Sequence, residues 1–153
     1  MPAAEGAIRV KLAHVGIYVR DMERSLRWYQ EVLGLKLSDY LPAGNTQEPA
    51  APHGICWLRY RYDDLHHELV LVQLPPGALQ AGETGRPGSL QQVAFRLGSE
   101  AEVEAACARL QAAGVEILRP PRRQRMSGGL QFYFADPDGN KIELFSSANR
   151  LPY

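Results

Sequence analysis

The chain of 153 residues has the length of one compact domain, which is enough to bury a hydrophobic core without disulfide or metal staples. Hydrophobic residues make up 45% of it and charged residues 22%, as is ordinary for a soluble globular protein. Lysine plus arginine and aspartate plus glutamate both number 17, so no net charge draws the chain to nucleic acid or to an anionic membrane. A small-molecule ligand or a protein partner is therefore favoured.

The cysteine content and the apolar patterning point to a reducing compartment. Cys56 and Cys107 are the only cysteines and do not form a CxxC motif, so the sequence predicts neither a disulfide framework nor a thiolate metal centre. The N-terminus lacks the apolar run of a signal peptide, and no stretch reaches the ~20 apolar residues that span a bilayer. We therefore expect a soluble cytoplasmic protein.

Residues 10–74 are predicted to form a first module. Its first strand, residues 12–19, alternates apolar and more polar positions and places His14 on the face away from the covering helix. Asp21 can cap a helix whose apolar residues recur at helical spacing, and Gly34 ends that helix. A right-handed crossover should lay the helix on the sheet.

Three further strands complete the first module, at residues 35–40, 55–62 and 67–74. A loop rich in Pro, Gly and Ala precedes the second of these strands, and Glu68 lies near the start of the third. The facing of the strand at 55–62 stays open, because its arginines and its apolar residues can be assigned to either face.

Residues 75–89 contain four glycines and three prolines without periodicity, which is typical of a linker. A second module follows at 90–147. Tails of residues 1–9 and 148–153 flank the two modules. The predicted organisation is therefore two modules of similar length joined by a linker.

The second module repeats the order of elements of the first. Its opening strand carries Gln92, Ser99 and Glu102 form a capping box, and Gly114 ends the helix that they begin. Three strands follow at residues 115–118, 130–135 and 141–146, and a DPDGN hairpin turn joins the last two.

A loop is expected between Arg119 and Gly129, where four arginines, two prolines and two glycines occur. The simpler interpretation is a solvated connection, and the alternative is a mobile rim that meets a carboxylate or phosphate of a ligand. On the next strand, Tyr133 shares a face with Gln131, opposite two phenylalanines. A tyrosine in a strand is more often ordinary packing, but this face leaves a role in a site open.

The two modules carry polar residues at matching places. His14 and Gln92 lie on the first strands, whereas Glu68 and Glu143 lie on the last ones. Such donors in two copies of one unit can converge on a single divalent metal ion. A lone histidine on a strand is more often structural, but its pairing with Glu143 through the repeat favours a site. Glu143 needs a partner, a metal ion or an arginine such as Arg96, because burying an unpaired charge is costly.

These residues and their surroundings resemble the vicinal oxygen chelate superfamily, the group of glyoxalase I, methylmalonyl-CoA epimerase, extradiol dioxygenases and the fosfomycin and bleomycin resistance proteins. The likeness covers residues 10–147 and implies an α+β fold, with two tandem βαβββ modules that form a cupped mixed β-sheet around a divalent metal. The segments that carry the likeness are HVGIYV at 14–19, Asp21, Trp28-Tyr29, Leu33-Gly34-Leu35 and FADPDGNKIEL at 134–144.

Carried over position by position, the resemblance implies His14, Glu68, Gln92 and Glu143 as metal ligands, with zinc, nickel, manganese, cobalt or iron as the ion. Glyoxalase I is similar in using His or Gln with two Glu at these places. This implies isomerase or lyase chemistry on a small substrate that chelates the metal through neighbouring oxygens. Glu68 could equally be solvated at the strand entry; as a ligand it could also act as a base. Glu143 and Tyr133 are the other candidate catalytic residues.

Two other functions stay open within the resemblance. An extradiol dioxygenase would use two histidines and one carboxylate, but Gln92 stands where the second histidine is expected, although Tyr133 lies where those enzymes place a tyrosine. A metal-free binding protein of the bleomycin resistance type is the third function, because Gln92 weakens the ligand set. A homodimer is expected, and the site forms either within one chain or by exchange of modules between two chains.

Overall fold

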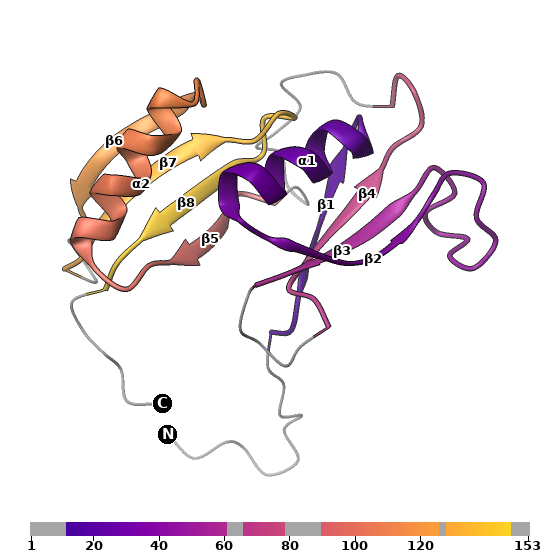
Figure 1. Ribbon diagram of the computed structural model, residues 1–153, viewed down its shortest axis with the longest axis horizontal. Helices are drawn as coiled ribbons and strands as arrows, with labels where there is room; N and C mark the ends of the chain where they lie inside the picture. The colour runs from indigo at the N-terminus through magenta and orange to yellow at the C-terminus, as the bar shows by residue number, and fades with distance from the viewer. Residues whose placement is uncertain (1–11, 61–65, 79–89, 126–127, 148–153) are drawn as a thin grey trace, which may run out of the picture.

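The computed structural model of the chain describes residues 12–60, 66–78, 90–125 and 128–147 (Figure 1). The predicted terminal tails and most of the predicted linker lie outside these residues. Within the described part, no helix is long and apolar enough to cross a membrane.

The first module is one mixed sheet with one helix. Its sheet has the strand order β1-β4-β3-β2, and β1 runs parallel to its neighbour β4. The remaining pairs are antiparallel. In chain order the elements are β1 (Val15–Val19), α1 (Met22–Leu33), β2 (Lys36–Leu41), β3 (Ile55–Arg59) and β4 (Leu69–Gln73).

The second module repeats this plan. Its sheet has the order β5-β8-β7-β6, and β5 runs parallel to β8. The elements are β5 (Val93–Arg96), α2 (Glu100–Ala112), β6 (Ile117–Arg123), β7 (Leu130–Ala135) and β8 (Lys141–Phe145). The predicted α+β fold of two tandem βαβββ modules is confirmed, and each module contributes a four-stranded sheet.

The helices begin where the sequence predicts. The Asp21 side chain accepts a hydrogen bond from the backbone N–H of Arg24, and Gly34 ends α1 in the left-handed conformation with φ 72°. Ser99 caps α2 in the same way, through the N–H of Glu102. Glu102 completes the cap by accepting from the N–H of Gly98, which satisfies a second backbone donor.

The prediction of a loop between Arg119 and Gly129 is wrong in its first half. β6 continues through two prolines to Arg123, so half of the expected loop is a strand. β6 is an edge strand, and a proline is tolerated there because its missing N–H would have faced solvent. The pairing with β7 shifts register on both sides of Arg119, which lets the prolines fit.

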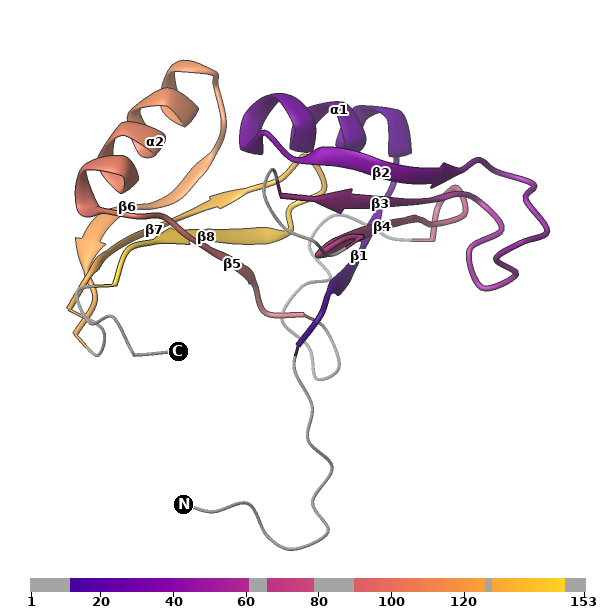
Figure 2. The ribbon, with the colours of Figure 1, turned by 60° about the horizontal axis from the view of Figure 1, so that its bottom comes forward.

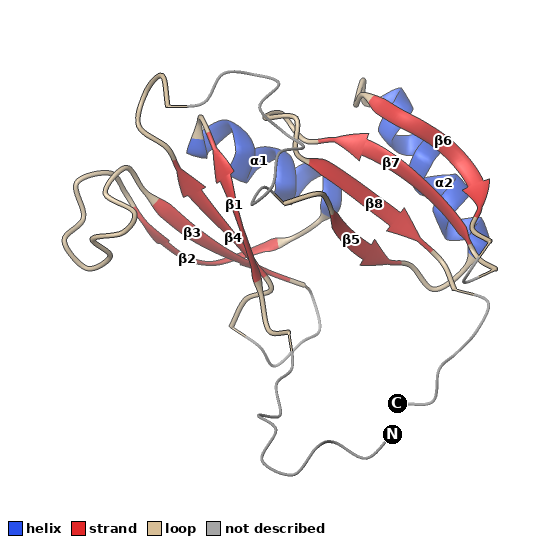
Figure 3. Ribbon diagram, turned by 180° about the vertical axis from the view of Figure 1, so that it is seen from behind, coloured by secondary structure: helices blue, strands red, loops and turns tan. Residues whose placement is uncertain are grey.

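Both helices lie on the same side of the two sheets (Figure 2), and the view from behind shows the strands in front of them (Figure 3). We call the side of each sheet that is turned away from its helix the open face. One hydrophobic cluster joins the helices to the sheets and draws on both modules, with Tyr29, Leu58 and Leu71 from the first and Val103 and Phe132 from the second. The two modules therefore share a core.

The turn between β7 and β8 fastens the second module to α1 of the first. Asp138 accepts hydrogen bonds from the side chains of Arg20 at 2.7 Å, Arg24 at 2.7 Å and Ser25 at 2.9 Å. Burial of this carboxylate acts to raise its pKa, but these bonds outweigh burial and hold the pKa below its usual value. The turn is thus bound to the first module through a charged carboxylate.

Asp136 forms the buried half of the same contact. Its carboxylate accepts the hydroxyl of Tyr29 at 2.8 Å and the backbone N–H groups of Asp138 and Asn140. Tyr29 is fully buried and Asp136 is 5% exposed, so the bond between them lies in the interior. A carboxylate with this many donors fixes both the shape of the turn and its place on α1.

The two cysteines are buried and free. Burial raises the pKa of the Cys56 thiol to about 12 and also raises the pKa of Cys107. Both thiols therefore stay protonated at neutral pH, which agrees with the absence of any predicted role in a disulfide or a thiolate site.

Candidate metal centre

The first pair of candidate ligands lies at the entrance to two neighbouring parallel strands. The N–H of Val15 donates to the carbonyl of Glu68 at 2.9 Å, and Val15 is in register with Leu69. His14 and Glu68 are the residues immediately before these two strands, so the pairing of β1 with β4 brings them side by side. His14 is exposed and Glu68 is half-buried.

The two carboxylate oxygens of Glu68 have different surroundings. Oε2 accepts the backbone N–H of Tyr60 at 3.0 Å, which holds the side chain against the end of β3. Oε1 is buried and accepts no hydrogen bond from the described residues. A buried carboxylate oxygen without a donor is costly, so Oε1 has an open place for a cation or for a proton on a ligand.

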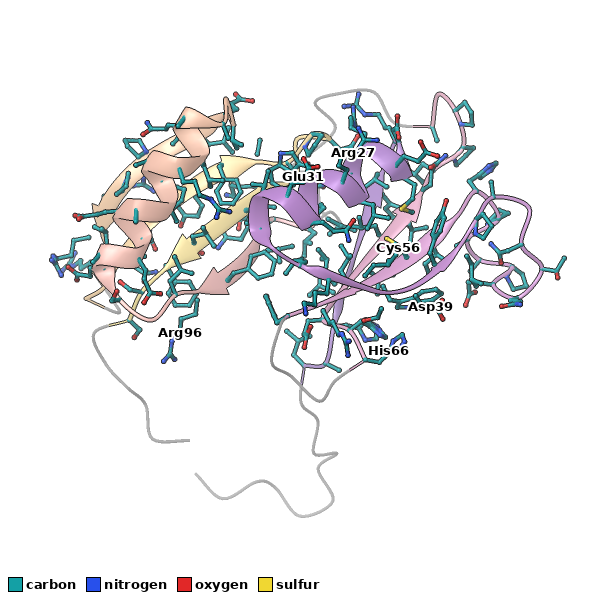
Figure 4. The ribbon with its side chains drawn as sticks, viewed as in Figure 1. Arg27, Glu31, Asp39, Cys56, His66 and Arg96 are labelled. Atoms are coloured by element: carbon teal, nitrogen blue, oxygen red, sulfur yellow. The ribbon has the colours of Figure 1, made fainter. Side chains whose placement is uncertain are left out.

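Two further histidines lie near this pair. The rings of His14 and His67 lie 4.5 Å apart between centroids, and Nδ1 of His66 lies 2.8 Å from Nδ1 of His67. Burial, followed by the charges of His14 and His66, lowers the pKa of His67 and favours its neutral form. Figure 4 shows His66 at the lower edge of the first module. His67 packs against the candidate ligand His14.

The second pair of candidate ligands belongs to a hydrogen-bonded chain on the open face of the second module. Gln92 donates from Nε2 to Oε2 of Glu143, and Tyr133 also forms a side-chain hydrogen bond with Glu143. Glu143 is 6% exposed, and burial raises its pKa although these two bonds and the charge of Lys141 act to lower it. The expected partner of Glu143 was a metal ion or Arg96, whereas the bonds to its carboxylate come from neutral groups.

Tyr133 lies between two cations. The guanidinium of Arg119 lies 5.8 Å and the ammonium of Lys141 5.3 Å from the centroid of its ring. Burial, together with the charge and hydrogen bond of Glu143, raises the pKa of the Tyr133 phenol, and Gln131 also hydrogen-bonds to this side chain. The phenol therefore stays protonated at neutral pH and holds a proton next to Glu143.

The structure brings His14 to Glu68 and Gln92 to Glu143, but the two pairs lie on separate sheets. Among the described residues of one chain, no group of three or more His, Cys, Asp and Glu side chains is placed to hold a metal ion. The open faces of both sheets are turned to the same side (Figure 2). Convergence of all four donors on one ion therefore stays a prediction.

The sequence does not reveal the role of Asp136 and Asp138. The DPDGN segment indicates a turn, and the structure has that turn, but the same aspartates also bind α1 of the first module. The sequence did offer one signal. The turn contains two aspartates within three positions, which is more than a tight turn needs. Their partners lie more than a hundred residues away in the chain, so local patterns could not identify them.

A family model described as the Glyoxalase/Bleomycin resistance protein/Dioxygenase superfamily matches residues 11–144. The chain belongs to this superfamily. The match includes all four candidate ligands and both modules, so the resemblance to the vicinal oxygen chelate proteins is confirmed.

Curated relatives agree with this assignment. Glutathione transferase FosA of Serratia marcescens is 30% identical over 139 residues, which cover 87% of this chain and 78% of the relative. Lactoylglutathione lyase of Salmonella typhimurium is 24% identical over 138 residues, which cover 90% of this chain and 93% of the relative.

Solved structures share the fold. A glyoxylase/bleomycin resistance protein/dioxygenase domain from Frankia sp. EAN1pec has a TM-score of 0.72 at 23% identity, covering 94% of this chain and 96% of that one. The fosfomycin resistance protein FosX from Listeria monocytogenes has a TM-score of 0.63 at 19% identity, covering 92% and 96%. At these identities the comparison establishes the architecture.

Proposed function

We propose that the chain is a divalent-metal-dependent enzyme that moves a proton on a small substrate, with isomerase or lyase chemistry of the glyoxalase type. The observation that carries this proposal is Oε1 of Glu68, a buried carboxylate oxygen without a hydrogen-bond donor among the described residues. The strand that follows Glu68 is paired with the strand that follows His14. A cation or a transferred proton would satisfy that oxygen. The superfamily and the curated relatives, whose names are those of enzymes, support catalysis.

The residues that would hold the ion are His14, Glu68, Gln92 and Glu143. One imidazole, two carboxylates and one amide oxygen suit a borderline divalent ion such as zinc, nickel, manganese, cobalt or iron. When bound, such an ion polarises two neighbouring oxygens of a substrate and stabilises the negative charge that develops as a proton leaves.

The chain's own residues would carry the proton. Oε1 of Glu68 is the proposed base, because it is the oxygen with an open place, while Oε2 stays anchored to the N–H of Tyr60. Glu143, whose pKa is raised by burial, holds the amide of Gln92 and the phenol of Tyr133 in place. Tyr133 would orient the substrate by donating a hydrogen bond.

Two copies of the chain would share each site. In this arrangement His14 and Glu68 of one chain meet Gln92 and Glu143 of a second copy, so that a homodimer has two sites. The support is that one chain keeps the two pairs on separate sheets. In addition, β1 and β5 are both edge strands of the described sheets, so each offers backbone groups to a partner.

A second candidate function is a metal-free binding protein of the bleomycin resistance type. The observation that favours it is the bonding of Glu143, whose carboxylate already forms hydrogen bonds with Gln92 and Tyr133. It predicts tight binding of a small molecule that a chelator does not change. An extradiol dioxygenase is less well supported, because Gln92 would have to replace the imidazole that holds iron in such enzymes.

Metal analysis distinguishes these functions. Protein purified without a metal-binding tag should contain close to one divalent ion per chain, and His14→Ala should lose most of it. His53→Ala is the matched control, because it removes a half-buried imidazole outside the two pairs. If wild-type protein and His14→Ala carry the same small amount of metal, the metal-dependent proposal is wrong and the binding function takes its place.

A further inference from the structure

Part of the open face of the first module is apolar. β3 and β4 pair Trp57 with Val70 and Ile55 with Val72, so these side chains share one face. They form a hydrophobic cluster separate from the main core, which Ala51 of the loop before β3 also joins. On the neighbouring β1, the exposed Tyr18 is in register with Val72 and extends the same surface.

The open face of the second module has the opposite character. Arg119, Tyr133 and Glu143 form one cross-strand row, because Tyr133 is in register with both of the others. Arg122 and Gln131 form the next row. With the ammonium of Lys141 near the Tyr133 ring, three cations and one carboxylate lie around Tyr133 on this surface. The balance of charge attracts an anion.

Two features distinguish this cationic face from an ordinary solvated strand. Gln131 is 6% exposed, and its Oε1 is buried without a hydrogen-bond partner among the described residues. Among the described residues, neither Arg119 nor Arg122 forms an ion pair. By contrast, Arg123 on the same strand is paired with Glu100 at 2.7 Å. In the part of the chain that the structure describes, Arg119 and Arg122 thus lack the acidic partner that Arg123 has.

The cations are also placed for recognition. Arg119 and Lys141 lie at 5.8 Å and 5.3 Å from the Tyr133 ring, so two positive groups flank the phenol that hydrogen-bonds to Glu143. An anion bound there would sit beside the candidate site. Gln131 Oε1 would at the same time accept a hydrogen bond from a hydroxyl or an amide of the ligand.

We infer that the substrate combines an apolar body with an anionic group, the body lying on the Trp57 and Tyr18 surface of the first module and the anion between Arg119, Arg122 and Lys141 of the second. This inference rests on the proposed function, because a shared site is what brings the two faces to one ligand. The anion is a carboxylate or a phosphoryl group, because arginine binds the oxygens of both through two parallel hydrogen bonds.

Calorimetric titration with simple probes tests the inference. Phenylphosphonate and phenylacetate carry both features and differ in the anion, benzyl alcohol lacks the charge, and inorganic phosphate lacks the apolar body. We expect one of the two anionic aromatic probes to bind at least about tenfold more tightly than benzyl alcohol and than phosphate. The tighter of the two identifies the anion.

Two double variants locate the binding. Arg119→Gln with Arg122→Gln should weaken the anionic aromatic probes by about tenfold or more, whereas Arg123→Gln with Arg125→Gln removes the same charge from the same segment and should not. Tyr18→Ser, an exposed position, should weaken the aromatic probes and leave the affinity for phosphate unchanged.

Equal affinity for benzyl alcohol and the anionic probes, or equal weakening by the two double variants, would overturn the inference. The metal content of each variant is measured in parallel. Loss of probe selectivity with normal metal content refutes the substrate class alone, whereas wild-type protein without metal refutes the proposed function whatever the probes show.

Discussion

The two modules have the same plan, but they treat their equivalent carboxylates differently. In the first module, one oxygen of Glu68 accepts a backbone N–H, and the other is buried without a donor among the described residues. In the second, the carboxylate of Glu143 forms hydrogen bonds with Gln92 and Tyr133. The two modules thus place carboxylates at matching positions. The carboxylate of the first module has an oxygen that is open to a ligand, whereas the carboxylate of the second belongs to a hydrogen-bonded network. The comparison suggests that the first half supplies the reactive carboxylate and the second half orients the substrate.

The connection between the last two strands of the second module also acts on the first module. In the second module this connection is the turn at residues 136–140, which binds α1 of the first module through Asp136 and Asp138. The turn belongs to one module but stabilises the contact between both. The fixed spacing of the two open faces within one chain therefore depends on two aspartates of the second module.

Asp136→Ala should have the largest effect on stability. It removes a buried carboxylate and leaves the Tyr29 hydroxyl and two backbone N–H groups without an acceptor, so we expect a loss of about 3 kcal/mol or more in the free energy of unfolding. Denaturant unfolding measures it. Asp39→Ala, at an exposed position, is the control and should change the unfolding midpoint little. Similar losses in both variants would refute the role of the turn.

Asp138→Asn should have a smaller effect that depends on pH. The hydrogen bonds from Arg20, Arg24 and Ser25 lower the pKa of Asp138, so its carboxylate stabilises the fold at pH values above its unfolded-state pKa of about 4. We expect a cost of about 1 kcal/mol at neutral pH. That cost should vanish as the pH falls through the lowered pKa of the folded state. Unfolding curves at several pH values test this, and a cost that persists at low pH would contradict it.

The smallest predicted effect has the opposite sign. Burial raises the pKa of Glu143, so in metal-free protein its ionised form is disfavoured by folding, and Glu143→Gln should stabilise that form of the protein by up to about 1 kcal/mol at neutral pH. The gain should disappear as the pH falls below about 4, where Glu143 is protonated in both folded and unfolded chains. Glu104→Gln, at an exposed position on α2, is the matched control. A gain of equal size there would show that the burial of Glu143 is not its cause.

The sequence predicts the repeated order of elements because that order is written in local patterns. Asp21 and Ser99 as helix caps, Gly34 as a stop signal and the alternation of strand residues all act within a few positions. The extent of β6 was missed, because two prolines argue for a loop unless the strand is known to lie at an edge. Edge position is a property of the sheet, which local patterns do not report.

The candidate site was predicted in part for the same reason. The period of the strands and the repeat identify His14, Glu68, Gln92 and Glu143 as equivalent positions, and register then pairs them two by two. Neither the neutral partners of Glu143 nor the placement of Arg119 beside Tyr133 could be predicted. Both depend on which strands become neighbours and on where a bulge shifts their register.

The most direct test of the shared site combines two inactive variants in one dimer. His14→Ala and Glu143→Ala chains, each with a different removable tag, are co-expressed, and the mixed dimers are isolated and analysed for metal. If the first pair of one chain meets the second pair of its partner, one of the two sites is intact, and mixed dimers should hold about half the metal of wild type. Mixed dimers with no more metal than dimers of either variant alone would contradict a site shared between two chains.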